Sequence, residues 1–170
     1  RERISVFVIL SGDEHSSEYV AEADRRIAYF TGFTGSAGTA IVGLDFAELA
    51  TDSRYHLQAK RQLSSDWTVR KLGNPGIVGW EDALAAQKGR VGIDPKTTPF
   101  DVAESLRAKD IDVVPVPDLI VELWGSSRPQ LPDEPIWQLP LKFTGETWKS
   151  KIERVRNVLG DVDALLLYSL

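Results

Sequence analysis

Three short segments hold the side chains of this chain that could do chemistry: residues 11–19 (SGDEHSSEY), 30–39 (FTGFTGSAGT) and 51–55 (TDSRY). They contribute the imidazole of His15, a glycine-rich loop and the guanidinium of Arg54. Each segment adjoins an apolar run, so we expect the three to meet at one rim of a β-sheet. Loops held on a rigid scaffold are where function concentrates.

The glycine-rich segment has the composition of a loop whose backbone amides could cradle a phosphate. It lacks the Lys-Ser/Thr ending of a P-loop and the G-x-G-x-x-G spacing of a dinucleotide site. Its GSAG run at 35–38 is not a G-x-S-x-G nucleophile elbow either. The glycines are therefore expected to permit tight turns and close packing against the following strand.

The elements that position these loops follow from apolar periodicity. Strands are expected over 4–10, 39–42, 47–50, 67–72, 90–93 and 112–116, and helices over 18–29, from about 54, over 80–86 and from 98 to about 109. Asp52 or Ser53 is expected to cap the second helix, and Thr98 the fourth. Strands alternating with helices predict an α/β fold with a mixed sheet flanked by helices.

The last third of the chain changes character at residue 128. Prolines at 129, 132, 135 and 140 exclude a helix interior or a central strand. We therefore predict a domain over 1–127, a proline-rich linker over 128–142, and the first helix and strand of a second, truncated α/β domain over 143–170. In that last part Thr144 is expected to cap a helix whose apolar stripe consists of Trp148, Ile152, Val155 and Leu159.

Composition excludes several classes of function. The net charge of −5 leaves no basic surplus for nucleic acid or an anionic membrane. No apolar run approaches the roughly 20 residues of a transmembrane helix. The absence of Cys rules out disulfides, Cys-ligated zinc and a thiol nucleophile, and it suits a cytoplasmic location. Because the chain also lacks Met, we interpret it as a fragment of a longer protein.

Taken in order, the three loop segments resemble the N-terminal domain of the Xaa-Pro aminopeptidases, the aminopeptidase P branch of the creatinase and prolidase superfamily. Residues 143–151 (FTGETWKSK) also resemble the start of that family's second domain. The resemblance implies a creatinase/prolidase N-terminal domain with a ribonuclease H-like fold, followed by a related domain. It is most similar to the eukaryotic cytosolic three-domain type, in which the catalytic domain comes last.

The resemblance also implies the reaction of the parent protein. Family members remove the N-terminal residue that precedes a proline, using two divalent metals, usually manganese, held by two Asp, one His and two Glu. This chain, with only two His and no matching carboxylate motif, is expected to hold no metal and to be inactive alone. The implied partners are a peptide with proline at its second position, the protein's own C-terminal catalytic domain and a second copy in a homodimer.

Within the resemblance, Arg54 matches the arginine of the family's Thr-Asp-Gly-Arg-Tyr motif, which reaches the substrate end of the active site. A guanidinium suits this role because it presents a rigid, permanently charged fork of donors to a carbonyl or carboxylate. Ser53 replaces the family's usual glycine. His15 is the second candidate for substrate contact. The structural alternatives are that Arg54 pairs with Asp52 or Asp13, and that His15 is simply exposed or ties its loop down through hydrogen bonds to Asp13 or Glu18.

The sequence therefore predicts a domain that gates substrate access and supports dimer assembly in a metal-dependent Xaa-Pro aminopeptidase. An alternative is a non-catalytic creatinase-like module that binds peptides or proteins, as in the large subunit of the FACT histone chaperone. A purely structural domain is a third possibility. The remaining histidine, His56, is expected to be structural because it lies within a helix beside Arg54.

Overall fold

The structure is a computed structural model that describes residues 3–87 and 89–167. The chain divides into two compact units, residues 1–131 and residues 132–170, and each is described by itself. The first contains the sheet and all three loop segments. The second contains two short helices.

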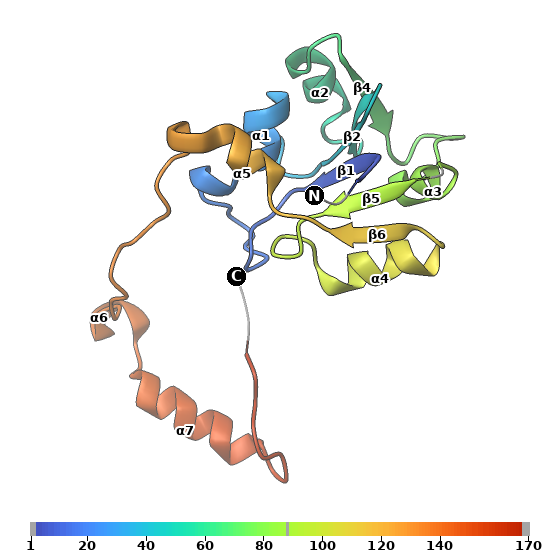
Figure 1. The fold of residues 1–170 in the computed structure, drawn as a ribbon. Coiled ribbons are helices and arrows are strands. Elements are labelled where there is room, and N and C mark those ends of the chain that lie inside the picture. Colours follow the sequence, from blue (N-terminus) through green and yellow to red (C-terminus); the bar gives the residue numbers. More distant parts are fainter. Residues whose placement is uncertain (1–2, 88, 168–170) are drawn as a thin grey trace. The chain divides into compact units, whose positions relative to one another are not determined.

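The first unit is built on one mixed sheet of six strands with the order β4-β3-β2-β1-β5-β6 (Figure 1). The strands are β1 (Val6–Leu10), β2 (Thr39–Gly43), β3 (Ala47–Thr51), β4 (Trp67–Lys71), β5 (Arg90–Ile93) and β6 (Asp112–Pro115). The pairs β1/β2 and β2/β3 are antiparallel, and the other three pairs are parallel. All six strands expected from the sequence are present, and the prediction of a mixed sheet flanked by helices is confirmed.

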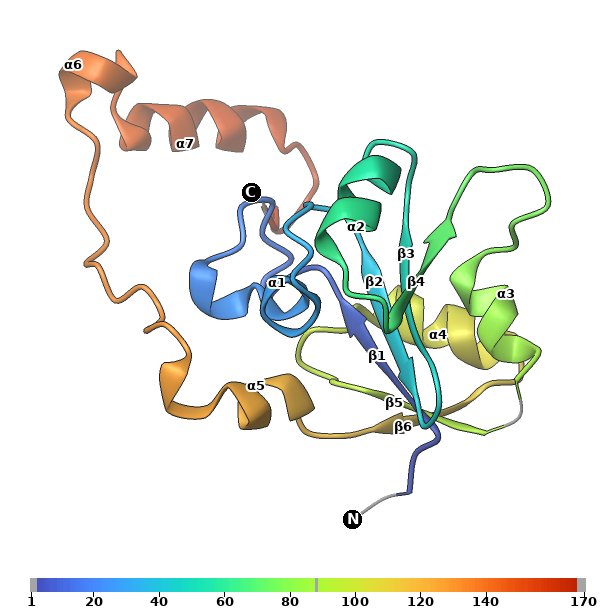
Figure 2. The ribbon, with the colours of Figure 1, turned by 90° about the horizontal axis from the view of Figure 1, so that it is seen from above.

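Helices cover both faces of the sheet (Figure 2). On one face lie α1 (Arg26–Thr31), α2 (His56–Gln62) and α5 (Leu119–Trp124), and on the other α3 (Trp80–Ala85) and α4 (Phe100–Ala108). In β1, Phe7 and Ile9 enter the first core, and Val6 and Val8 enter the second. A strand buried on both faces explains the unbroken apolar run that the sequence shows there.

The strand directions decide where the three loops lie. Strand β2 runs against its neighbours, so it begins at the edge of the sheet where β1 and β3 end. The segments after β1, before β2 and after β3 therefore meet at that edge, as the sequence predicts. We call this edge the loop rim, defined by residues 11–19, 32–38 and 52–55.

The prediction of one helix over residues 18–29 is wrong. The chain instead forms a short 3-10 helix over Glu22–Asp24 and then α1. Ala21 is extended, with φ −62° and ψ 153°, and Arg25 has ψ 57°, so neither residue continues a helix. Helix α1 ends at Gly32, whose φ of 79° is the left-handed conformation that glycine adopts without strain.

Helix caps differ from the sequence expectation in two places in this unit. Helix α2 has Tyr55 at its N-cap, without a capping side chain. Helix α4 has Pro99 there rather than Thr98. Helix α5 was not expected at all, and it is capped by Asp118, which accepts hydrogen bonds from the backbone N–H groups of Ile120 and Val121.

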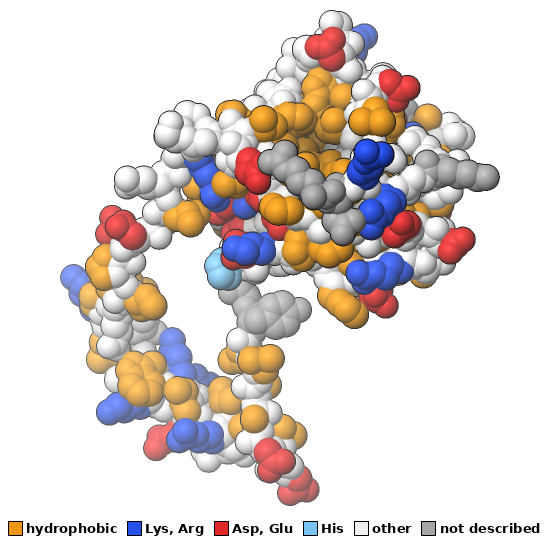
Figure 3. Space-filling model, viewed as in Figure 1, with side chains coloured by type: hydrophobic (Ala, Val, Ile, Leu, Met, Phe, Trp, Pro, Cys, Tyr) orange, Lys and Arg blue, Asp and Glu red, His pale blue; other side chains and the backbone are white. Residues whose placement is uncertain are grey.

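The second unit contains α6 (Leu141–Thr144) and α7 (Trp148–Val158). The expected cap Thr144 belongs to α6, so the expected linker end at 142 overlaps a helix. The cap of α7 is Thr147, whose side chain accepts from the backbone N–H of Ser150. Apolar side chains of this unit, including Trp148 and Ile152, lie at its surface (Figure 3). Residues 163–167 form no strand, and residues 168–170 of the expected strand lie outside the described residues.

Candidate functional site

Hydrogen bonds join the three segments of the loop rim. The Ser11 hydroxyl donates to the carbonyl of Gly38 at 2.7 Å and accepts from the backbone N–H of Gly38 at 3.1 Å. The Thr51 hydroxyl, which is buried, donates to the carbonyl of Ala37 at 2.6 Å. The segment before β2 is thus held from both sides, by the end of β1 and by the end of β3.

The glycine-rich segment wraps around Phe33, whose ring is 1% exposed. A Cβ atom added to Gly35 would lie 2.2 Å from Cζ of Phe33 and 2.8 Å from Cδ1 of Tyr55. The Tyr55 ring meets the Phe33 ring edge-on, with centroids 5.8 Å apart, and its hydroxyl lies 2.7 Å from the Ser36 hydroxyl. The absence of a side chain at Gly35 therefore allows close packing, as the sequence suggested.

Arg54 extends from the loop after β3 into solvent, with 67% of its side chain exposed. Its Nε and Nη2 atoms donate to the two carboxylate oxygens of Asp52 at 2.9 and 2.8 Å. The guanidinium carbon also lies 5.2 Å from the centroid of the Tyr55 ring. One of the structural alternatives, the pair with Asp52, is therefore present. It leaves the guanidinium at the surface of the loop rim, where substrate contact stays a prediction.

The pair with Arg54 lowers the pKa of Asp52 to about 2, chiefly through the side-chain hydrogen bonds. A carboxylate with a depressed pKa in the folded protein contributes stability above its unfolded value of about 3.9 and loses it as the pH falls through the folded value. The Asp52–Arg54 pair should therefore make its full contribution above about pH 4 and lose it as the pH falls toward about 2.

A carbon-detected NMR titration of the Asp52 carboxyl group checks this geometry. The midpoint should lie near 2 in the unaltered chain and return toward about 3.9 in Arg54→Ala. Arg61→Ala, which removes another exposed arginine, is the matched control and should leave the midpoint in place. A midpoint that Arg54→Ala does not move would contradict the pairing.

His15 lies in the exposed part of the loop after β1. The backbone N–H groups of His15 and Ser17 both donate to Oδ1 of Asp13 at 2.9 Å, so the backbone rather than the imidazole ties this loop down. Burial raises the pKa of Asp13, but these hydrogen bonds outweigh it and leave the pKa below the ordinary value. The second histidine, His56, has Nε2 3.1 Å from the carbonyl of Thr51, which fits the expected structural role.

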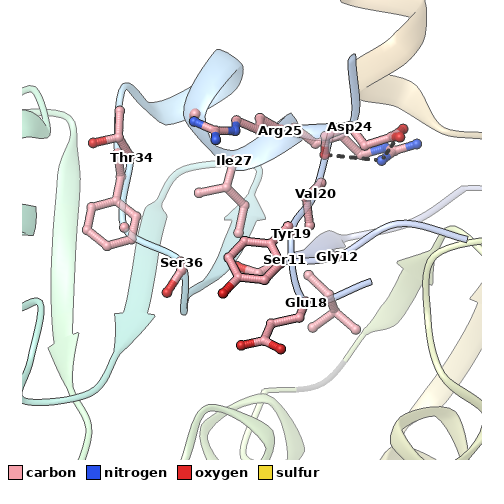
Figure 4. Close-up of a pocket in the computed structure, with 15 residues that line it drawn as sticks. Ser11, Gly12, Glu18, Tyr19, Val20, Asp24, Arg25, Ile27, Thr34 and Ser36 are labelled. Atoms are coloured by element: carbon pink, nitrogen blue, oxygen red, sulfur yellow. Dashed lines mark hydrogen bonds and ion pairs between the residues drawn. The ribbon is translucent and has the colours of Figure 1, made fainter. Parts of the chain in front are cut away.

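A pocket of about 200 Å³ opens beside these loops, between the segment after β1 and helix α1 (Figure 4). Neither Arg54 nor His15 is among the residues that line it. Its lining comes from residues 10–12, 18–20, 24–28 and 33–36. We call it the α1 pocket. Sequence reasoning missed it because residues 18–25 were assigned to a helix, whereas their extended part forms one wall.

Two residues of the pocket lining, Asp24 and Arg26, belong to a group of four charged side chains that the sequence analysis also missed. Arg26 is 5% exposed; its Nε donates to Asp118, and its Nη1 lies 3.2 Å from Oδ1 of Asp24. Arg128 joins the group, with Nη2 2.9 Å from the same oxygen of Asp24. The cluster connects α1, the cap of α5 and the chain after α5. An arginine within the apolar sequence of α1 was the signal that could have revealed it.

One family model matches most of this chain. The model described as Creatinase/Prolidase N-terminal domain matches residues 1–123. The chain belongs to the creatinase/prolidase N-terminal domain family. The matched residues include all six strands, every segment of the loop rim and the α1 pocket.

Relatives of this creatinase/prolidase domain have consistent names. The chain is 40% identical over 164 residues to a probable Xaa-Pro aminopeptidase P of Coprinopsis cinerea, covering 92% of this chain and 26% of the relative. It is 41% identical over 162 residues to human Xaa-Pro aminopeptidase 2, covering 92% of this chain and 24% of the relative. The chain thus spans about a quarter of the length of these relatives.

Solved structures of similar fold include an X-prolyl aminopeptidase from Caenorhabditis elegans, described as a cytosolic enzyme with a di-nuclear active site. The TM-score is 0.81 at 32% identity, over 93% of this chain and 27% of the other. The X-Pro aminopeptidase of Thermotoga maritima shares the fold, with a TM-score of 0.54 at 23% identity over 71% of this chain and 33% of the other.

Within residues 3–87 and 89–167, no three side chains of His, Cys, Asp or Glu are placed to hold a metal ion together. The described residues therefore do not fit the two divalent metals that the family resemblance implies. In the same part of the chain, no helix is both long and apolar enough to cross a bilayer.

Proposed function

We propose that this creatinase/prolidase domain is the N-terminal part of a metal-dependent Xaa-Pro aminopeptidase, and that it gates substrate access to a catalytic domain outside this chain. The observation that carries the proposal is the place of Arg54, an exposed guanidinium held at the loop rim by Asp52 and Tyr55. The names of the relatives and the match to residues 1–123 support the reaction class.

The part of this chain in the reaction is to bind and exclude. The Arg54 fork would donate to a carbonyl or carboxylate of a peptide that has proline at its second position. Its pair with Asp52 is exposed on both sides, so exchanging that carboxylate for a substrate group costs little. His15, in the adjoining loop, would contact the same peptide. The body of the domain would sterically exclude internal segments of long chains.

The parent protein would supply the chemistry. Two divalent metals, manganese in our proposal, would be held in the missing catalytic domain and would activate water there. The description of the Caenorhabditis elegans enzyme as cytosolic and di-nuclear supports both the metal pair and a cytoplasmic location. The intact protein would act as a homodimer, whereas this chain alone would be inactive.

The test is Arg54→Ala in the full-length parent protein. We expect kcat/KM for a tripeptide with proline at its second position to fall about tenfold, because a charge-assisted hydrogen bond to substrate is lost. Metal content should stay unchanged. Arg61→Ala, an exposed arginine on α2, is the matched control and should keep the original kinetics.

Unaltered kinetics in Arg54→Ala would remove Arg54 from the site without touching the reaction class. A parent protein that lacks the Asp, Asp, His, Glu, Glu set and cleaves no peptide would instead favour the alternative, a non-catalytic module that binds peptides or proteins.

A further inference from the structure

The ring of Tyr55 lies beside the guanidinium of Arg54, with the guanidinium carbon 5.2 Å from the ring centroid. The guanidinium also donates to both carboxylate oxygens of Asp52. Among the described residues, no other ion pair, side-chain hydrogen bond or ring contact reaches the guanidinium. When a substrate group replaces the carboxylate of Asp52, the Tyr55 ring is therefore the neighbour that remains.

Three contacts hold the Tyr55 ring in place. It meets the Phe33 ring edge-on, at 89° between the ring planes, and Phe33 is fixed because it is 1% exposed in the core. The backbone of Gly35 lies close to the ring, since a Cβ atom added there would be 2.8 Å from Cδ1 of Tyr55. The Tyr55 hydroxyl lies 2.7 Å from the Ser36 hydroxyl, a hydrogen-bond distance. The orientation of the ring beside Arg54 is therefore determined by its surroundings.

Ser36 is a well-anchored partner for this hydroxyl, although it lies at the surface. Two residues earlier, the Thr34 hydroxyl accepts from the side-chain amides of Gln58 and Gln62 on α2, at 3.0 and 2.9 Å. Two residues later, Gly38 is hydrogen-bonded in both directions to the serine after β1. The loop is held on both sides of Ser36, so the hydrogen bond between the two hydroxyls restricts the Tyr55 ring.

A fixed aromatic ring limits the freedom of a neighbouring arginine. An exposed arginine side chain populates many rotamers, and a ligand that binds it must order them, which weakens binding. The ring quadrupole attracts a guanidinium that lies within about 6 Å of the ring centroid. The distance of 5.2 Å between Arg54 and Tyr55 is inside this range. The ring therefore orders the fork of Arg54 before a substrate arrives.

We propose that Tyr55 is the positioning residue for Arg54, and that the Ser36 hydroxyl sets its orientation. The ring holds the guanidinium at the loop rim while the fork exchanges Asp52 for a carbonyl or carboxylate of the peptide. This inference rests on the proposed function of Arg54. It gives the glycine-rich loop a part in substrate affinity, through one hydroxyl group, and no part in the chemical step.

The first test measures the order of Arg54 directly, by ¹⁵N relaxation of arginine Nε–H groups in the 170-residue chain. Asp52→Asn imitates loss of the carboxylate and keeps an oxygen for the backbone N–H of Arg54. In this background the Nε–H order parameter of Arg54 should stay above that of Arg61, an exposed arginine on α2. Adding Tyr55→Leu should lower it to the value of Arg61, because the ring is gone.

Ser36→Ala gives the same measurement without disturbing the core, since Ser36 is exposed. In the Asp52→Asn background it should lower the order parameter of Arg54, by less than Tyr55→Leu does. Ser127→Ala is the matched control. It removes a serine hydroxyl that donates to the carbonyl of Trp124 at 2.8 Å, outside the loop rim, and should leave Arg54 unchanged.

The second test is kinetic and uses the full-length parent protein with the proline tripeptide. Tyr55→Phe and Ser36→Ala each remove one half of the same hydrogen bond. Each should raise KM about threefold and leave kcat unchanged, because the lost interaction binds ground state and transition state alike. The double variant should be no worse than either single one, and Ser36→Thr, which keeps a hydroxyl, should retain the original KM. Tyr29→Phe removes a hydroxyl that donates to the carbonyl of Leu123, and this control should behave as the unaltered protein.

A lower kcat at unchanged KM would indicate a smaller folded fraction, a merely structural role, and overturns the inference. So does a threefold effect of Tyr55→Phe that persists in an Arg54→Ala background, because Tyr55 would then act without Arg54. Unchanged KM in Tyr55→Phe and Ser36→Ala, with Arg54→Ala still impaired, overturns the inference and leaves the proposed function standing. If Arg54→Ala itself has unaltered kinetics, the proposed site fails, and the order parameter of Arg54 alone decides whether Tyr55 positions it.

Discussion

Arg26→Ala is expected to lower the free energy of unfolding of the first unit by about 3 kcal/mol, near the low end of the cost of breaking a buried ion pair. The Arg26 side chain is 5% exposed and pairs with both Asp24 and Asp118. Its removal therefore leaves two poorly solvated carboxylates without the cation that they share. Part of the cost is offset. Asp24 keeps Arg128, and Asp118 keeps two backbone N–H donors at the start of α5.

Urea unfolding followed by far-UV circular dichroism measures this change. The matched control is Arg25→Ala, one residue earlier, where the arginine is half-exposed and pairs with the exposed Glu22; its effect should stay within about 0.5 kcal/mol. Equal effects of the two variants would mean that the cluster contributes no more than a surface ion pair. A loss of hydrogen-exchange protection concentrated in α5 would identify Asp118 as the partner that carries the cost.

The parts of the fold that the sequence predicts well are those with a single local signal. The unbroken apolar run at Val6–Leu10 and the alternation at Trp67–Lys71 each indicate a strand, and both strands are present. The hairpin between β2 and β3 depends on close packing at Gly43, where an added Cβ would meet the Phe46 ring at 2.1 Å. The order of the strands in the sheet, by contrast, depends on pairings far apart in the chain.

The errors come from competing local signals. Val20, Ala23 and Ile27 have helical spacing, but Val20 lines the α1 pocket while Ile27 packs into the core from α1. The helical spacing of these three residues therefore does not come from one helix. It joins residues of different segments whose side chains all face apolar surroundings. In the second unit, Thr144 and Thr147 both lie shortly before the apolar stripe that begins at Trp148, and the hydrogen bond from the backbone N–H of Ser150 to Thr147 shows which of them caps α7.

The candidate site also has parts that the sequence predicts and parts that it does not. The loop rim was predictable because three segments adjoin strand ends, and strand direction then brings them together. The α1 pocket was not predictable, because its lining combines residues 10–12, 18–20, 24–28 and 33–36, and the expected helix over residues 18–29 would arrange the middle two groups differently. The pairing of Arg54 with Asp52 was expected as an alternative, since only Ser53 separates these two residues along one loop.

Phe33→Ala is expected to destabilise the first unit by about 3–5 kcal/mol, the usual cost of removing a buried aromatic ring. The ring is 1% exposed and lies in the main core, where Gly35, Gly38 and Tyr55 contact it closely. Because Tyr55 would lose its edge-on partner, the loop that carries Arg54 should also lose hydrogen-exchange protection. Phe100→Ala is the matched control: this ring is 77% exposed, and its loss should cost no more than about 0.5 kcal/mol.

The contact between Phe33 and Gly35 gives the same prediction a sharper form. Gly35→Ala alone should cost about 1–3 kcal/mol, because the new Cβ overlaps a ring that the core holds in place. In a Phe33→Ala background the ring is gone and only the contact with Tyr55 at 2.8 Å remains, so the cost of Gly35→Ala should shrink. The two changes should therefore be non-additive by about 1 kcal/mol or more in a double-mutant cycle of urea unfolding. Additive costs would show that the loop relaxes freely away from Phe33. The Phe33 ring would then not be the reason why position 35 requires a glycine.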